Sequence, residues 1–401
     1  PEFGPYFTGA YHTPWGDALN LDDAHSDEVR RYICHNALMW LRDYRFDALR
    51  LDAVHAFHDR SAEHLLEQIA REVHELAVRI GRPLAVIAES DLNDPRVVRH
   101  PTAGGYGCDA QWSDDFHHAL HALLTGEQVG YYLDFGRMEH LARALTNAYV
   151  YDGVYSPHRK RRHGAPPTGL NGSSFLGYIQ NHDQIGNRAQ GDRLSTIVPE
   201  EAMKTAHAIV FCSPFVPMIF QGEEWGARQP FQYFTDHPNL ELAEAVRKGR
   251  RSEFESFGWN PESIPDPQAP ETFERCRLDW DDLNDERHRA ILEWTRSLIR
   301  LRREYPELTD GEMDLVEVAY SEDEGWIAFR RGRILVAANL SSESRSIAFS
   351  ILPIAAGVPL ERSRALLTTS DGNAWRAAGE EGAVSLAPGG GMILELAEIE
   401  G

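Results

Sequence analysis

The sequence lacks long apolar runs, paired cysteines and an excess of positive charge. No apolar run reaches the roughly 20 residues that a membrane-spanning helix needs, so we expect no membrane partner. The 401 residues include 40 basic and 62 acidic side chains, giving a formal net charge of −22, which disfavours nucleic acid and anionic membranes as partners. These absences favour an enzyme that acts on a neutral molecule.

The four cysteines are scattered along the chain and show no CxxC spacing. They are Cys34, Cys108, Cys212 and Cys276. We expect free thiols rather than a disulfide or metal framework, as is usual in the cytoplasm. No signal peptide is recognisable, and residues 1–5 are a loop-like opening without an initiator methionine. We predict a cytoplasmic location, with no cofactor and no bound metal.

Short apolar segments alternate with helical patterns through most of the chain, after a loop-like stretch over residues 1–25. Strands are predicted at residues 46–52, 83–88, 109–112, 175–180 and 216–221. Helices are predicted from Ser26 and from Ser61, and over residues 114–124, 138–148, 200–211 and 284–303. Strand–helix–strand order with short connections predicts parallel pairing.

The pattern changes after Pro306, where short alternating strands follow one another without helices between them. We therefore predict a catalytic α/β domain over residues 1–305 and a small antiparallel β-sandwich domain over residues 306–401. A closed (β/α)8 TIM barrel needs eight strands, and fewer are recognisable here. Either some strands escape this pattern or the barrel lacks its first strands in this chain, and the second is the fold we predict.

Three of the predicted strands end in carboxylates. The first ends at Asp52, with Arg50 two residues earlier, so that both side chains point to the same face. The second runs into Glu89, and the strand at 175–180 runs into Asp183. Because barrel enzymes carry their catalytic residues at the carboxyl ends of the strands, these side chains are the candidates for chemistry.

Two carboxylates that flank one bond can cleave a glycoside, one attacking the anomeric carbon while the other protonates the leaving oxygen. A third can stabilise the positive charge of the transition state, and Asp52, Glu89 and Asp183 fit these three roles by position. Each also has a structural explanation. Arg50 and Asp52 could form a buried ion pair, Glu89 could be solvated, and Asp183 could cap a helix.

Three short segments resemble signatures of glycoside hydrolase family 13, the α-amylase family. They are RLDAVH over residues 50–55, AES over residues 88–90 and NHDQ over residues 181–184. The longer segments 89–96, 111–118 and 178–188 resemble the members of that family that release trehalose from maltooligosyl trehalose. The likeness covers nearly the whole chain and weakens in the C-terminal β domain.

The resemblance implies that Asp52 is the nucleophile, Glu89 the general acid/base and Asp183 the transition-state stabiliser. It implies a retaining hydrolase that cleaves the α-1,4 bond joining trehalose to a maltooligosaccharide. Arg50 is expected to keep Asp52 ionised, and Glu89 needs a raised pKa to be protonated near neutrality. Further substrate contacts are predicted at Arg50, His55, Trp112, Asp115, Tyr132, Arg159, His182 and Gln184.

Two other functions remain open from the sequence. A glucan-branching or other transglycosylating member of the same family would use the same three carboxylates, and an inactive carbohydrate-binding fragment would use none. The family's first signature is absent and is expected just before Pro1. We therefore expect these 401 residues alone to be inactive or poorly folded, because an open barrel leaves sheet edges unpaired.

Three polar clusters also have simpler explanations than a ligand. The histidines at 117, 118 and 121 have a spacing that could bind zinc, but a hydrogen-bonded helix start is the better interpretation. Glu223 and Glu224 could bind calcium, although a barrel loop or substrate rim fits better. The basic run over residues 159–162 is interpreted as a solvated loop or a sugar-binding rim.

Overall fold

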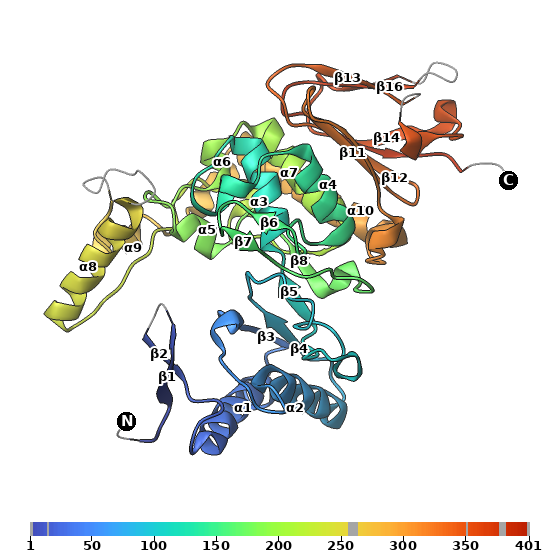
Figure 1. The fold of residues 1–401 in the computed structure, drawn as a ribbon. Helices are drawn as coiled ribbons and strands as arrows, with labels where there is room; N and C mark the ends of the chain where they lie inside the picture. Colours follow the sequence, from blue (N-terminus) through green and yellow to red (C-terminus); the bar gives the residue numbers. More distant parts are fainter. Residues whose placement is uncertain (1–2, 14–15, 256–263, 350–351, 377–381, 399–401) are drawn as a thin grey trace. The chain divides into compact units, whose positions relative to one another are not determined.

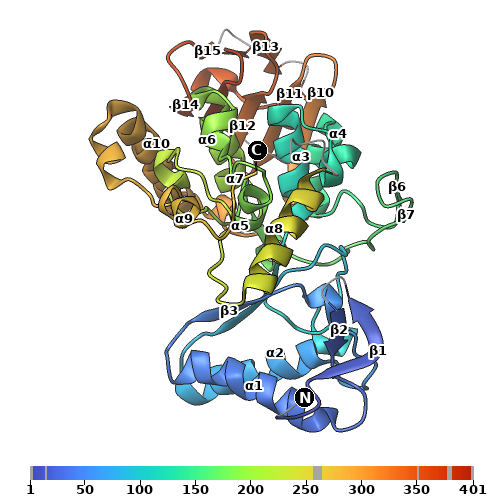
Figure 2. The ribbon, with the colours of Figure 1, turned by 90° about the vertical axis from the view of Figure 1, so that its left-hand side faces the viewer.

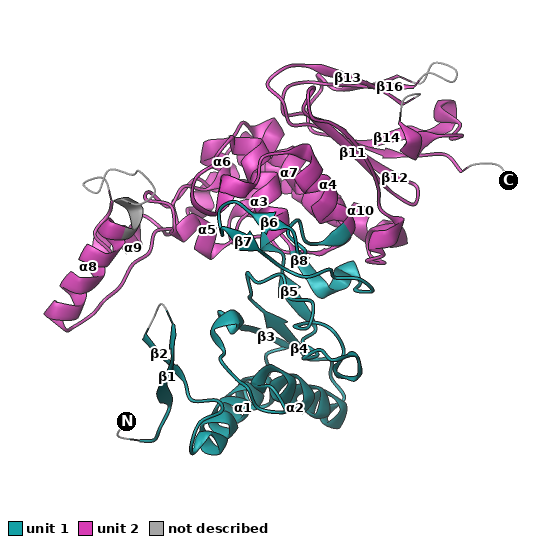
Figure 3. Ribbon diagram, viewed as in Figure 1, with its two compact units in different colours: residues 1–114, 147–176 teal, residues 115–146, 177–401 magenta. Residues whose placement is uncertain are grey.

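The computed structural model describes residues 3–13, 16–255, 264–349, 352–376 and 382–398. The chain divides into two compact units, which are coloured separately in Figure 3. Unit 1 comprises residues 1–114 and 147–176, and unit 2 comprises residues 115–146 and 177–401.

Unit 1 is built on parallel strands with helices between them (Figure 1). Its main elements are α1 (Ser26–Arg42), β3 (Ala48–Leu51), α2 (Leu65–Ile80), β4 (Ala85–Ala88), β5 (Ala110–Trp112) and β8 (Phe175–Gly177). Strands β3, β4, β5 and β8 pair in parallel in that order, as the strand–helix–strand pattern predicts. Helices α1 and α2 lie side by side (Figure 2).

Two local predictions in unit 1 are wrong. The first 25 residues are not all loop, because β1 (Phe7–Thr13) and β2 (Gly16–Leu19) pair as an antiparallel hairpin. Ser61 does not cap α2: the helix begins at Leu65, and the ring of His64 accepts a hydrogen bond from the N–H of Leu66 at 3.1 Å. The helix ends as predicted at Gly81, which adopts a left-handed φ of 65°.

Unit 2 begins with helices. They are α3 (Asp114–Thr125), α4 (Met138–Asn147), α5 (His182–Gly186), α6 (Leu194–Ile197), α7 (Glu200–Cys212), α8 (Leu240–Glu255), α9 (Pro270–Glu274) and α10 (Glu286–Glu304). The short strand β9 (Val216–Pro217) follows β8 in the sheet order, and the N–H of Met218 donates to the carbonyl of Gly177 at 2.9 Å. Gly177 has no room for a side chain, since a Cβ there would lie 2.9 Å from the ring of Phe215.

Antiparallel sheets form the C-terminal part of unit 2. The strands are β10 (Glu317–Ser321), β11 (Trp326–Arg331), β12 (Ile334–Asn339), β13 (Arg345–Ala348), β14 (Arg364–Thr368), β15 (Ala374–Arg376), β16 (Ala383–Leu386) and β17 (Gly391–Glu395). One sheet has the order β10-β11-β12-β17-β14 and the other β13-β16-β15. Side chains of both sheets share one apolar core, including Leu335, Ile347 and Val384, as the predicted sandwich requires.

The four cysteines are free and buried, so the prediction of free thiols is confirmed. Among the described residues, no helix combines the length and apolar character needed to cross a membrane. The predicted domain boundary between residues 305 and 306 stays a prediction, because unit 2 contains both helices and the antiparallel sheets.

Candidate active site

The first two predicted carboxylates follow neighbouring strands of one parallel sheet. In the register of β3 and β4, Leu51 is paired with Ala88, so Asp52 and Glu89 each come one residue after paired positions. The N–H of Glu89 donates to the carbonyl of Leu51 at 3.0 Å, and the N–H of Val54 donates to the carbonyl of Glu89 at 3.0 Å. Because the strands run in the same direction, both carboxylates leave the sheet at the same edge.

Arg50 joins the two carboxylates. Its guanidinium forms an ion pair with Asp52, and its Nη2 lies 2.7 Å from Oε1 of Glu89. The guanidinium carbon also lies 4.5 Å from the ring centre of Trp112 on β5, a cation–π contact. The side chain of Asp52 is 77% exposed and that of Glu89 only 16%. A reactant can therefore reach Asp52, while Glu89 is held from inside the protein.

Ala53 supplies the second contact that holds Glu89. Its N–H donates to Oε2 of Glu89 at 2.7 Å. This residue has φ 44° and ψ 46°, a left-handed conformation that costs a non-glycine residue roughly 1–2 kcal/mol. The turn starts η1 (Val54–Ala56) directly after the predicted nucleophile, so backbone strain lies at the centre of the candidate site.

Asp91, which the sequence interpretation missed as a site residue, follows Glu89 by two positions and carries an altered pKa. Burial by itself raises the pKa of Asp91, but the charges of Arg159, His55 and His163 and a hydrogen bond from Arg159 outweigh it. The result is a pKa below the usual value, so Asp91 is an anion near neutrality. His55 and Arg159 are both predicted site residues, and the negative charge of Asp91 next to both of them is consistent with that prediction.

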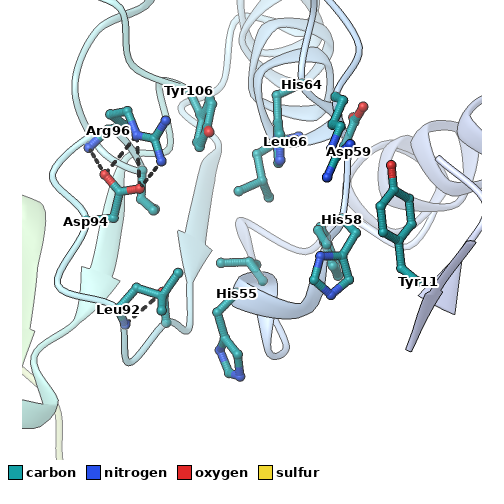
Figure 4. Close-up of a pocket in the computed structure, with 15 residues that line it drawn as sticks. Tyr11, His55, His58, Asp59, His64, Leu66, Leu92, Asp94, Arg96 and Tyr106 are labelled. Atoms are coloured by element: carbon teal, nitrogen blue, oxygen red, sulfur yellow. Dashed lines mark hydrogen bonds and ion pairs between the residues drawn. The ribbon is translucent and has the colours of Figure 1, made fainter. Parts of the chain in front are cut away.

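A cavity of about 480 Å³ lies in unit 1 among residues that follow the two carboxylates in the chain, and its volume is within the roughly 300–1,000 Å³ typical of small-molecule sites (Figure 4). His55, three residues after Asp52, lines it. So do two stacked aromatic pairs, Tyr11 with His58 at 5.2 Å and His64 with Tyr106 at 4.3 Å between ring centres. Other lining residues are Asp59, Arg60, Ser90, Leu92, Asp94 and Arg96.

Asp183 belongs to unit 2, at the start of the short helix α5. The structural alternative for it is wrong, because Asn181 caps the helix and its side-chain oxygen accepts from the N–H groups of Asp183 and Gln184 at 2.9 and 3.1 Å. The Asp183 side chain is 49% exposed, with Nε2 of His182 at 3.7 Å from Oδ1. The convergence of Asp183 with Asp52 and Glu89 stays a prediction.

Four of the predicted sugar contacts are buried in the structure. Tyr132 is 5% exposed, Asp115 6%, Trp112 7% and Gln184 9%, so direct contact of these side chains with a sugar stays a prediction. The hydroxyl of Tyr132 donates to Nε2 of His117 at 2.8 Å, and Nδ1 of His117 donates to the carbonyl of Ile179 at 2.7 Å. Both ring nitrogens of this histidine are therefore used in hydrogen bonds, which agrees with the simpler explanation of the histidine cluster.

Of the two sequence interpretations of Glu223, its burial contradicts the substrate rim and leaves the barrel loop. Glu223 is 2% exposed, and its Oε1 lies 3.3 Å from Nε2 of the equally buried His207 on α7. The turn that follows β9 has glycines at 222 and 226, and it places the Glu223 side chain in the interior. Two adjacent glutamates in the sequence do not indicate which of them is buried.

Known proteins resemble this chain over most of its length, although no protein-family model matches it. The malto-oligosyltrehalose trehalohydrolase of Arthrobacter ramosus is 51% identical over 337 residues, which are 84% of this chain and 58% of the relative. The enzyme of the same name from Mycobacterium tuberculosis (strain CDC 1551 / Oshkosh) is 45% identical over 352 residues, 87% of this chain and 60% of the relative.

The fold has a match among crystal structures. A Salmonella typhimurium protein described as a candidate α-amylase superposes with a TM-score of 0.82 at 35% identity, covering 98% of this chain and 64% of its own. The predicted fold class is thereby confirmed. The chain spans about three fifths of the length of the curated relatives it matches.

Proposed function

The chain belongs to the malto-oligosyltrehalose trehalohydrolases of the α-amylase family, and on that premise we propose that it carries the catalytic residues of a retaining glycoside hydrolase. Its substrate is maltooligosyl trehalose, and its action releases free trehalose. The observation that carries the proposal is the pair Asp52 and Glu89, which leave adjacent parallel strands at one edge and share the guanidinium of Arg50.

In this reaction Asp52 attacks the anomeric carbon of the last maltooligosyl unit. The bond from that carbon to O4 of trehalose breaks as Glu89 gives its proton to the leaving oxygen. The sugar is then held as an ester on Asp52. Glu89, now a carboxylate, takes a proton from water, whose oxygen attacks the same carbon and frees Asp52 with retention of configuration. Asp183 stabilises the positive charge of both transition states.

The contacts in unit 1 support these roles. Glu89 is held by Arg50 on one oxygen and by the N–H of Ala53 on the other, so its carboxyl group has a fixed direction. Asp52 is the more exposed of the two acids, as an attacking group requires. The cavity beside His55 and the residues after Glu89 lies on the side of the acid/base, and we assign it to the leaving trehalose. Its stacked aromatic rings suit the apolar faces of sugars.

A transglycosylating enzyme would use the same first step and differ only in the acceptor. Product analysis with maltooligosyl trehalose separates the candidates, since a hydrolase yields free trehalose and a shortened maltooligosaccharide. A branching enzyme yields transfer products without free trehalose, and an inactive binding protein yields neither. The free, buried cysteines support a cytoplasmic location as part of this proposal.

The roles of the two acids can be tested with azide and an α-maltosyl fluoride substrate in the full-length protein. Asp52→Ala leaves space for azide on the nucleophile's face, so we expect a glycosyl azide of inverted configuration. Glu89→Ala leaves the nucleophile intact, so azide should give the retained configuration. Hydrolysis of the natural substrate should fall by orders of magnitude in both variants. Identical azide products from the two variants would refute the assignment.

A further inference from the structure

Asp91 contacts two separate segments of unit 1 through three residues. One carboxylate oxygen accepts a hydrogen bond from Nη2 of Arg159 at 3.0 Å, and the other lies 3.8 Å from Nδ1 of His55. Its backbone carbonyl accepts a hydrogen bond from Nε2 of His163 at 2.8 Å. Asp91 therefore ties the segment after the predicted nucleophile and a distant hairpin to the loop that follows Glu89.

The hairpin consists of β6 (Tyr155–Ser156) and β7 (Arg161–Arg162), and its base is fixed to the same loop. The side chain of Asn93 donates to the carbonyl of Tyr151 at 2.9 Å, and the N–H of Ala165 donates to the carbonyl of Asn93 at 3.0 Å. Gly164 permits this approach, because a Cβ there would lie 2.0 Å from the carbonyl oxygen of Tyr151. The base of the hairpin is thus rigid, and Asp91 determines where Arg159 lies between the strands.

The loop after Glu89 lies on the leaving-group side if Glu89 is the acid/base, because that residue must reach the oxygen that departs. His55 and the loop residues Ser90, Leu92 and Asp94 line the cavity on this side, whereas Asp91 and its partner Arg159 do not line it. His55 and Arg159 both carry N–H donors, and an anionic partner orients such donors more strongly than a neutral one.

We propose that Asp91 is a positioning residue: its carboxylate, fixed by Arg159, directs His55 toward the hydroxyl groups of the leaving sugar. The inference rests on the proposed function and deepens it. Asp91 does not touch the reacting atoms but sets the direction of a donor, His55, that recognises the leaving group. It therefore contributes to the choice of a sugar leaving group and not to the chemistry at the anomeric carbon.

The test is Asp91→Asn in the full-length protein, assayed with maltooligosyl trehalose and with α-maltosyl fluoride. Fluoride departs without any sugar on the leaving side, so a residue that orients the leaving sugar is irrelevant to it. We expect kcat/KM for maltooligosyl trehalose to fall roughly 100-fold, the effect of misplacing a binding group by about 1 Å, and kcat/KM for the fluoride to stay unchanged.

Matched variants test whether the activity loss comes from the position of Arg159 or only from the removal of a positive charge. Arg159→Gln should reproduce the loss with maltooligosyl trehalose, whereas Arg161→Gln removes the same charge from an exposed residue of the same hairpin and should not. The double variant Asp91→Asn with Arg159→Gln should be no worse than either single change, because both remove one interaction. Asp109→Asn, which disrupts a comparable pair with His74 before β5, should leave both activities intact.

Equal losses on both substrates, or additive losses in the double variant, would overturn the inference. If Asp91→Asn does not fold, equal effects of Arg159→Gln and Arg161→Gln would overturn it instead. A wild-type protein that releases no trehalose refutes the proposed function, and the fluoride assay then still reports whether Asp91 affects the first chemical step. The two failures are therefore distinguishable.

Discussion

Arg50 illustrates how much of the site depends on the shape of one side chain. Its planar guanidinium reaches Asp52 with one nitrogen and Glu89 with another, and it lies against the ring of Trp112. A lysine ammonium carries the same charge as a single point and cannot bridge two carboxylates while stacking on a ring. The position should therefore require arginine and not merely a positive charge.

We predict that Arg50→Lys lowers kcat/KM roughly 100-fold in the full-length protein. The two carboxylates lose the guanidinium that contacts both of them, and a displacement of about 1 Å from the productive geometry has a cost of this size. The matched control is Arg82→Lys. Arg82 pairs with Asp47 and donates to the carbonyl of Leu41 at 2.6 Å, before the opposite end of β3. It should lower the melting temperature and leave kcat/KM nearly unchanged. Equal activity losses in the two variants would contradict a specific role for Arg50.

At this scale the sequence predicted the carboxylates but not their supporting contacts. Asp52 and Glu89 could be found because each follows an apolar strand, a local pattern. Asp91 makes its contacts with residues far away in the chain, at positions 55, 159 and 163, and no local pattern encodes them. Tyr132 illustrates the same limit, since an aromatic residue suits a sugar and a core equally well and its side chain is buried.

At the scale of elements, the segment that carries Asp183 is held at both ends. Before it, the carbonyl of Ile179 accepts a hydrogen bond from His117 on α3. After it, Arg188 donates two hydrogen bonds of 2.8 Å to the carboxylate of Glu127, which also lies 2.9 Å from Nε2 of His121. Strand β8 and helix α5 are short, so these side chains supply the rigidity that secondary structure alone does not.

The Glu127 contacts predict a pH-dependent stability. Burial raises the pKa of Glu127, but His121 and Arg188 outweigh it and lower the pKa to about 2, against 4.5 in the unfolded chain. The anion therefore stabilises the folded state fully above about pH 4.5, by on the order of 3 kcal/mol, and this contribution is lost as the pH falls toward 2. Burial also lowers the pKa of His121, which adds destabilisation below its usual value near 6.5.

Urea unfolding of the wild type and Glu127→Gln from pH 7 to pH 3 measures this contribution. The variant should be less stable at pH 7, and its stability should change less between pH 5 and pH 3. Glu293→Gln is the control, because Glu293 forms an exposed pair with Arg296 on α10 and should change neither quantity. Parallel pH curves for wild type and Glu127→Gln would show that the stability gained from the contacts with Arg188 and His121 does not depend on the charge of Glu127.

The order of the elements could be predicted, but some of their boundaries could not. The apolar stripe of α2 is periodic and was found, whereas its cap by His64 is a side-chain contact that could equally have come from Ser61. The β1–β2 hairpin was missed because its strands are largely exposed and carry no apolar alternation. Exposed hairpins are specified by hydrogen bonds rather than by burial, and these leave little trace in the sequence.

At the scale of the whole molecule, the C-terminal sheets of unit 2 contribute directly to its helices. Both carboxylate oxygens of Glu322, in the turn between β10 and β11, accept N–H groups at the start of α4, from Met138 at 3.0 Å and Glu139 at 2.8 Å. Arg331 of β11 is 2% exposed and donates to the carbonyl of Ser213, just after α7, at 2.8 Å. The sheets and the helices of this unit should therefore unfold together.

We predict that Arg331→Leu destabilises both parts of unit 2, by roughly 3 kcal/mol, because it leaves the buried carbonyl of Leu308 without its donor, leaves the carbonyl of Ser213 with only the 3.2 Å bond from Arg302, and removes the 2.6 Å ion-pair partner of Asp310. Amide hydrogen exchange should show lost protection in α7 as well as in β11 and β12. The control is Arg330→Leu, one residue earlier, whose bonds go to the carbonyls of Gly332 and Ile354 within the β-sheet region.

The comparison of these two variants also decides whether residues 306–401 behave as a separate domain. If they do, Arg331→Leu should weaken protection in the sheets alone and leave α7 as stable as in Arg330→Leu. If the division into compact units describes the energetics, the loss should extend across the predicted boundary into α7, since the Arg331 guanidinium completes hydrogen bonds that the end of that helix cannot satisfy itself. If the increase in amide exchange is confined to β10–β17, residues 306–401 unfold independently, and the predicted domain boundary at residue 306 is a boundary in stability.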